Sequence, residues 1–283
     1  SRVTRRPVAW WNRPWTGERV VRLLVTTSVL VTTTVVMMLV VHLNPLSPSS
    51  DLVFDRTTPT GGDMGAHVWA PAFLRDHFLT NFQISGWSMD WYAGIPLYRF
   101  YMVVPALAIV ALDVVLPYGV AFKLIAISGL VTFPLACWAF GRLAAFRHPI
   151  PELFAVGALC FLLDESFSIY GGNVLSTMAG EYSFSISLTL AMLGLGFLAN
   201  GLRTGRYRVW AAVLLSLSAV SHGIVLICVA VAATIICLVW MDRRRLVYAV
   251  TTGVTVLLLS AWWVGPFLFG HEFMTDMKYG FRP

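Results

Sequence analysis

The feature that most constrains this chain is a series of apolar runs, each close to the length that a helix needs to cross a bilayer. Crossing a hydrocarbon core of about 30 Å takes roughly 17 to 25 helical residues. Such runs lie at residues 20–43, 118–140, 152–170, 182–202, 207–222, 223–241 and 246–268. The composition agrees, since 58% of the 283 residues are hydrophobic, 12% are charged and the mean hydropathy is +0.74. We therefore expect an all-α, polytopic membrane protein with about seven transmembrane helices in a single module over residues 1–283.

The positions of the basic residues predict how these helices are oriented. Arginines cluster in the N-terminal tail and in three short segments between apolar runs: Arg2, Arg5, Arg6, Arg13, Arg19 and Arg22, then Arg142 and Arg147, then Arg203, Arg206 and Arg208, then residues 243–245. Loops rich in Lys and Arg remain in the cytoplasm. All four clusters fall on that side if residues 1–19 form a cytoplasmic tail, residues 44–117 the first extracytoplasmic loop and residues 118–270 the remaining spans. The pI of about 9.4 then reflects these basic loops and not nucleic-acid binding. The placement of the arginines predicts a multi-pass protein of the plasma (inner) membrane with a cytoplasmic N-terminus.

The apolar stretch at residues 96–116 is an exception to the series. Pro96 and Pro105 interrupt it, and Asp113 lies near its end. If this stretch crossed the bilayer, the loop with Arg142 and Arg147 would be placed outside, against the positive-inside rule. We expect residues 96–116 to lie in the outer interface or to re-enter the bilayer from that side.

The first outer loop contains a second stretch with helical character, residues 64–79. We expect a short interfacial helix there, kinked at Pro71, whose aromatic residues Trp69, Phe73 and Phe78 face the membrane. A loop of this length with its own apolar pattern is usually functional.

The segment GGDMGAH, residues 61–67, places a carboxylate and an imidazole at the start of that helix. Gly61 and Gly62 allow a tight turn, after which Asp63 and His67 lie one helical turn apart on the same side. Asp63 could cap the helix by accepting a hydrogen bond from a backbone N–H two or three residues on, which is worth about 1 kcal/mol. It could also serve as a general base, and the two roles do not exclude each other.

The second long outer segment, near residues 164–181, carries three carboxylates: Asp164, Glu165 and Glu181. Each of them, taken singly, is compatible with a solvated surface position. If they are close together and desolvated, they would either share a proton or bind a divalent cation such as Mg or Mn through oxygen ligands. His222, between two later spans, is either a polar residue at a helix end or a further site residue.

The expected architecture resembles the module shared by the glycosyltransferase C (GT-C) superfamily. In both, one span is followed by a long outer loop, with an aspartate near its interfacial helices, and then by six more spans. The residues that carry the resemblance are Asp63 in GGDMGAH, the stretch PLYRFYMVVPAL at residues 96–107, and AGEYSFS at residues 179–185. Many members have paired acidic residues in the first outer loop, whereas here Met64 and Gly65 follow the aspartate. The resemblance covers nearly the whole chain.

The resemblance implies transfer of a sugar from a polyprenyl-phosphate carrier to an acceptor of the cell envelope, which could be a glycan, a lipid or a protein. It places the reaction on the extracytoplasmic face, among membrane lipids and with a membrane protein as a possible partner. In this reading Asp63 and His67 are catalytic, and Asp164 and Glu165 are candidate metal ligands. The expected substrate-binding residues are Arg75, Arg99, Lys123, Glu181 and His222.

A transporter, a flippase or a non-catalytic scaffold of the same architecture is the alternative. A transporter usually places ionisable residues near the bilayer midplane. In this sequence the centres of the apolar runs are almost free of such residues, and the acids collect at the expected outer ends. This placement favours the enzyme.

Overall fold

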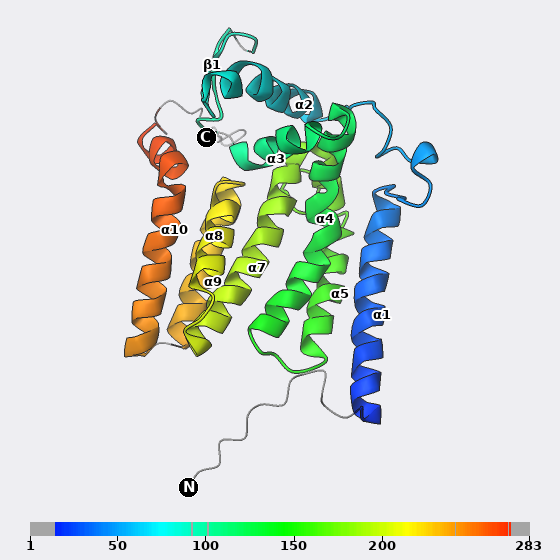
Figure 1. The fold of residues 1–283 in the computed structure, drawn as a ribbon, viewed down its shortest axis with the longest axis vertical. Helices are drawn as coiled ribbons and strands as arrows, with labels where there is room; N and C mark the ends of the chain where they lie inside the picture. The colour runs from blue at the N-terminus through cyan, green and yellow to red at the C-terminus, as the bar shows by residue number, and fades with distance from the viewer. Residues whose placement is uncertain (1–14, 92, 101, 241, 271, 273–283) are drawn as a thin grey trace, which may run out of the picture.

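The computed structural model describes residues 15–270 and 272, apart from residues 92, 101 and 241. In this part of the chain, seven helices lie side by side in a bundle, and shorter elements cover one of its ends (Figure 1). The bundle helices are α1 (Gly17–Val40), α4 (Tyr118–Leu143), α5 (Ile150–Leu162), α7 (Tyr182–Thr204), α8 (Arg208–Ala219), α9 (Gly223–Val239) and α10 (Arg243–Phe269). The protein is therefore mostly helical, as expected.

Four helices in the described part are long and apolar enough to cross a membrane. They are α1, α4, the helical segment at 174–204 that ends with α7, and α10. The helices α5, α8 and α9 coincide with the other expected runs but are shorter, at 13, 12 and 17 residues. The run expected at 152–170 is helical only as far as Leu162. The structure thus shows a mostly helical protein, in the part that is described, with four candidate membrane spans, and the finer expectation of seven crossings stays a prediction.

The two ends of the bundle differ in charge and in the segments that lie over them. One end, which we call the basic end, holds the junctions α4–α5, α7–α8 and α9–α10, and with them Arg142, Arg147, Arg203, Arg206, Arg208 and residues 243–245. The other end, which we call the loop end, carries residues 41–117 (Figure 1). The arginine clusters that fall in the described part therefore share one end, as the pattern of the sequence predicts.

Small and hydroxyl-bearing residues pack the central helix α7 against its neighbours. A Cβ at Gly129 of α4 would overlap the backbone of α7 at Ser185, and the hydroxyl of Thr189 donates a hydrogen bond to the Gly129 carbonyl over 3.1 Å. Ser187 of α7 and Ser218 of α8 each donate to the other's carbonyl oxygen, over 2.7 and 3.0 Å. Small residues let membrane helices approach closely. This packing fixes the start of α7 at the loop end.

The elements of the loop end form a cap over the bundle. After the short turn η2 (Pro48–Ser50) come α2 (Met64–Phe73), η3 (Leu74–Phe78), η4 (Leu79–Asn81), the antiparallel strands β1 (Gly86–Ser88) and β2 (Ile95–Leu97), and α3 (Val103–Asp113). Both α2 and α3 run across the end of the bundle and not alongside its helices (Figure 1). With 11 residues, α3 is only about 16 Å long and cannot span a hydrocarbon core. Residues 96–116 thus contain a strand, a turn and a short transverse helix.

Of the three aromatic residues expected to face the membrane from α2 and η3, Phe78 is buried inside the cap and the other two are half-buried. Phe78 is buried in a cluster with Leu97, Tyr98 and Val103, and Phe73 packs edge-on against it at 5.2 Å between ring centroids. Trp69 packs against the same cluster. The expectation that these three rings lie in the membrane is wrong for the buried Phe78, because the β1–β2 hairpin and α3 supply an apolar surface inside the cap.

Candidate functional site

A cavity of about 960 Å³ lies at the loop end, between the cap and the start of α7. Its walls come from α2, the β1–β2 hairpin, the turn before α3, α3 itself and the first turn of α7. The lining residues are Asp63, Ala66, His67, Trp69, Ala70, Pro71, Trp87, Trp91, Gly94, Ile95, Pro96, Leu97, Tyr98, Arg99, Phe100, Met102, Pro105, Ala106, Tyr182 and Ser183. A largely apolar cavity with a few polar groups is the usual form of a small-molecule site.

The backbone at Asp63 is fixed directly against the segment that leads into α7. The Asp63 N–H donates to the carbonyl of Ala179 over 2.8 Å. A Cβ at Gly62 would overlap that carbonyl, and a Cβ at Gly180 would lie 3.0 Å from the Asp63 Cβ and 3.2 Å from the His67 ring. Both glycines have positive φ, of +51° and +130°. Only glycine allows this conformation and this approach together, so the two segments, more than 100 residues apart, meet at the cavity.

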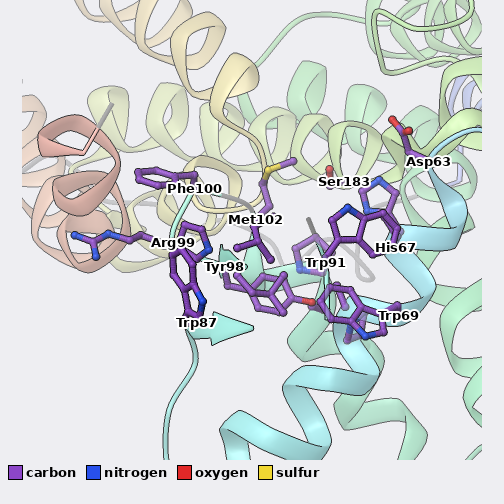
Figure 2. A pocket seen from close by; sticks show the side chains of 18 of the residues that line it. Asp63, His67, Trp69, Trp87, Trp91, Tyr98, Arg99, Phe100, Met102 and Ser183 are labelled. Atoms are coloured by element: carbon purple, nitrogen blue, oxygen red, sulfur yellow. The ribbon is translucent and has the colours of Figure 1, made fainter. Parts of the chain in front are cut away.

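The carboxylate of Asp63 does not cap α2. The helix begins after Asp63, but its side chain makes no capping hydrogen bond, and its backbone carbonyl instead accepts from the N–H groups of Ala66 and His67 over 3.1 and 3.2 Å. No described residue donates a hydrogen bond to this carboxylate. It lines the cavity beside His67 (Figure 2). The capping role that the sequence suggested is therefore not what holds this carboxylate in place.

His67 is a buried imidazole between two carboxylates. Its pKa is lowered, because burial outweighs the opposing effects of Glu181 and Asp63. The ring meets Tyr182 edge-on at 5.3 Å between centroids. His67 is therefore neutral at neutral pH, and a neutral imidazole can both accept and donate a proton.

Glu181 connects this site to a second histidine. It lies in the short π-helical turn η5 (Thr177–Glu181), which follows α6 (Val174–Ser176), and its carboxylate is 3.3 Å from Nε2 of His222 at the start of α9. The His222 ring is buried and packs on Phe184 at 4.7 Å between centroids, and within the described chain its Nδ1 has no hydrogen-bond partner. Asp63, His67, Glu181 and His222 are thus brought into one neighbourhood.

Aromatic side chains form the middle of the cavity wall. Trp69 of α2 stacks on Trp91 of the hairpin loop at 5.6 Å between centroids, and Trp87 packs against Gly94, where a Cβ would overlap its indole. Tyr98 projects from the turn after β2 (Figure 2). Sequence reasoning missed Trp87, Trp91 and Tyr98, because their common orientation depends on the hairpin, although three tryptophans within 23 residues were a compositional signal.

Arg99 lies at the far end of the same cavity from Asp63. Figure 2 shows Arg99 and Phe100 at one end, Asp63 and His67 at the other, and the aromatic residues between them. The turn that places Arg99 is closed by its N–H, which donates to the Pro96 carbonyl over 3.2 Å. Its guanidinium has no acidic partner in the part of the chain described. The cavity therefore has an acidic and imidazole end and a cationic end.

The structure places two other expected substrate-binding cations outside the cavity wall. Arg75 is paired with Asp113 of α3 over 2.5 Å and with Asp76 over 2.7 Å, and these carboxylates raise its pKa. Lys123 donates to the carbonyls of Leu52 and Asp55 over 2.5 and 2.7 Å. Arg75 joins η3 to α3 within the cap, and Lys123 of α4 holds the loop-end segment onto the bundle, so both cations are already engaged in this arrangement.

The two candidate metal ligands, Asp164 and Glu165, lie in the loop after α5. The Asp164 carboxylate accepts the Ser166 N–H over 2.9 Å, which lowers its pKa. The buried Asn173, which sequence reasoning did not single out, holds this loop by donating to the carbonyls of Asp164 and Phe167 over 2.6 and 2.8 Å. Among the residues described, no group of three or more His, Cys, Asp or Glu side chains is arranged to bind a metal ion. A divalent cation stays a prediction from the sequence.

Comparisons with known proteins add no relative. No family model, no curated protein and no solved structure matches this chain. The resemblance to the GT-C superfamily therefore rests on the architecture and on the three quoted stretches, and the function has to be argued from the site.

Proposed function

We propose that the protein is a membrane glycosyltransferase of the GT-C type, which transfers a sugar from a polyprenyl-phosphate carrier to an acceptor of the cell envelope. The observation that carries the proposal is the order of groups in the loop-end cavity, with Asp63 and His67 at one end and Arg99 at the other. The loop end faces the extracytoplasmic side and the basic end faces the cytoplasm, in keeping with the positive-inside rule. The membrane is the plasma membrane.

The donor lies along the aromatic wall in this proposal. Its phosphate is held at Arg99, whose guanidinium offers donors in a geometry that matches phosphate oxygens. The sugar ring packs against the indoles of Trp91 and of the exposed Trp87, which supply apolar contact area with polar edges. The acceptor hydroxyl then approaches from the end where Asp63 and His67 lie.

The reaction is a single displacement at the anomeric carbon. Asp63 takes the proton from the acceptor hydroxyl while the acceptor oxygen forms its bond to that carbon. The bond between the anomeric carbon and the phosphate oxygen breaks, and its electron pair leaves with the polyprenyl phosphate, whose charge Arg99 stabilises. His67 is neutral beside Asp63. A protonated imidazole would form an ion pair with the Asp63 carboxylate and make it a weaker base, so the neutral ring keeps the carboxylate available to take a proton.

The placement of charge supports the enzyme over a transporter. Between residues 182 and 202 of α7, and throughout α9, the sequence has no Asp, Glu, Lys or Arg. An ion-coupled transporter needs ionisable groups near the midplane of its spans. The titratable groups of this cavity lie at the loop end instead.

The test is the transfer of labelled sugar from polyprenyl phosphate in membranes that contain the chain. Because the Asp63 side chain makes no capping bond, Asp63→Asn should fold like the original chain and lose activity by about 10² or more. Arg99→Gln should lose activity, and Arg99→Lys should recover part of it, because lysine restores the charge without the fork of donors. The matched control is Asp55→Asn, an exposed carboxylate of the same loop outside the cavity wall, which should transfer sugar normally. Full activity of Asp63→Asn would contradict the proposal.

A further inference from the structure

A second cavity, of about 350 Å³, lies at the basic end of the bundle. It is formed where α7 ends and α10 begins, and its walls are Gly201, Leu202, Arg203, Thr204, Gly205, Asp242, Arg244, Arg245 and Tyr248. It is at the opposite end of the helices from the proposed donor cavity, and the proposed function does not use it.

The acid in its wall is already neutralised. The Asp242 carboxylate accepts the backbone N–H of Arg245 over 2.8 Å and pairs with the Arg245 guanidinium over 3.1 Å. The same guanidinium also donates to the carbonyl of Trp240 over 3.1 Å. Asp242 and Arg245 thus form a closed pair that fixes the start of α10 and leaves no net charge.

Among the described residues, Arg203, Arg206 and Arg208 have no ion pair with an acid, and Arg244 is near Asp242 but does not form a salt bridge with it. Arg203 and Arg244 are in the cavity wall, and Arg206 lies in the loop beside it. Arg208 stacks over the ring of Tyr248 at 4.9 Å, and the Tyr248 hydroxyl donates to the Arg206 carbonyl over 2.9 Å. These contacts hold α8, α10 and the loop after α7 together, so the arginines surround a formed hollow and are not spread along a mobile chain.

From this arrangement we infer a binding site for a phosphate group, and specifically for the headgroup of an anionic phospholipid. Guanidinium groups bind phosphate oxygens through paired, charge-assisted hydrogen bonds, and Arg203 and Arg244 supply two such groups. Basic pockets between helices at the cytoplasmic surface are known to bind anionic headgroups. A lipid is favoured over a free phosphate because the first two turns of α10 also expose Leu246, Val247 and Val250, along which acyl chains can lie.

The experiment measures lipid binding to the detergent-purified chain by native mass spectrometry. Phosphatidylglycerol should bind more tightly than phosphatidylcholine. The double variant Arg203→Gln/Arg244→Gln should lose about tenfold or more of the phosphatidylglycerol affinity, because each hydrogen bond to a charged group is worth that order of factor. The matched control, Arg142→Gln/Arg147→Gln, removes the same charge from the same end outside this cavity and should bind as the original chain does.

A variant with the opposite effect strengthens the test. Asp242→Asn keeps the helix cap, since asparagine caps as well as aspartate, but it releases Arg245 and should bind phosphatidylglycerol more tightly. Equal loss of binding in both double variants would overturn the site, because it would show attraction to the whole basic end. Displacement of the lipid by inorganic phosphate alone would overturn its assignment to a lipid headgroup, whereas failure of phosphate to compete would support it.

Discussion

The N–H of Asp63 donates to the carbonyl of Ala179 over 2.8 Å, and this bond joins the cap to the segment that leads into α7. It brings Asp63 and His67 beside Glu181, and through Glu181 beside His222. Asp63 and His67 line one end of the cavity, and Glu181 and His222 lie behind them, outside its wall.

The docking depends on two glycines. Gly180→Ala should destabilise the folded chain by about 1–3 kcal/mol, because alanine is strained at a φ of +130° and its Cβ would crowd Asp63. Gly62→Ala should behave similarly. The matched control is Gly65→Ala in the first turn of α2, where a Cβ meets nothing within 4 Å, and alanine should be neutral or stabilise by up to about 1 kcal/mol. Thermal unfolding in detergent measures all three. Equal stabilities for Gly180→Ala and Gly65→Ala would be inconsistent with the close approach.

The lowered pKa of His67 predicts a pH dependence of stability. An unfolded histidine titrates at about pH 6.5, and burial lowers the pKa of His67 in the fold. As the pH falls through that value, the unfolded chain binds the proton first, so stability is complete above about pH 6.5 and decreases below it. The unfolding temperature should therefore fall more between about pH 7.5 and about pH 5.5 in the original chain than in His67→Gln. The same dependence of unfolding temperature on pH in both proteins would mean that His67 does not cause the loss of stability at low pH.

The ion pair between Arg75 and Asp113 should hold α3 against η3. The Asp113 side chain is 12% exposed, whereas that of Asp76, the second partner of Arg75, is 51% exposed. A double-mutant cycle with Arg75→Gln and Asp113→Asn should give a coupling energy of about 1 kcal/mol. The cycle with Asp76→Asn should give less than about 0.5 kcal/mol and should vanish in high salt, because water and ions screen that pair. A larger coupling to Asp76 would reverse this ranking.

The aromatic wall should determine donor binding if the proposed function holds. Trp91→Ala removes the partner on which Trp69 stacks and should raise KM for the polyprenyl-phosphate donor about tenfold with little change in kcat, since its contacts are the same in ground and transition states. Trp210→Ala is the control, because this exposed tryptophan stacks on Phe197 near the basic end, away from the cavity. Steady-state kinetics in membranes separate the two parameters. A fall in kcat alone would show that Trp91 acts on the chemical step and not on binding.

The sequence identified several residues of the site but not how they are arranged. Asp63, His67, Glu181 and His222 could be named because polar residues at the ends of apolar runs are few. Their proximity could not be derived, since it depends on the glycine contact between residues 62 and 180. Arg75 and Lys123 were expected to bind substrate, but the sequence did not predict that both would be engaged by other groups of the protein. A carboxylate 38 residues away and two backbone carbonyls about 70 residues away satisfy these cations, and no local pattern reveals that.

The long helices and the collection of arginines at one end of the bundle could be predicted from the sequence alone. The runs at 20–43, 118–140, 182–202 and 246–268 became α1, α4, α7 and α10 with boundaries shifted by a few residues, because apolar length and the polar residues that end it are local properties. Which faces of the cap turn inward depends on packing between its elements. Phe78 looks like a membrane-facing residue along the chain, yet it is buried in a cluster with Leu97, Tyr98 and Val103, which the hairpin, the following turn and α3 supply. The cavity exists for the same reason: its walls are built by packing between segments, and the sequence of each segment alone does not specify its partner.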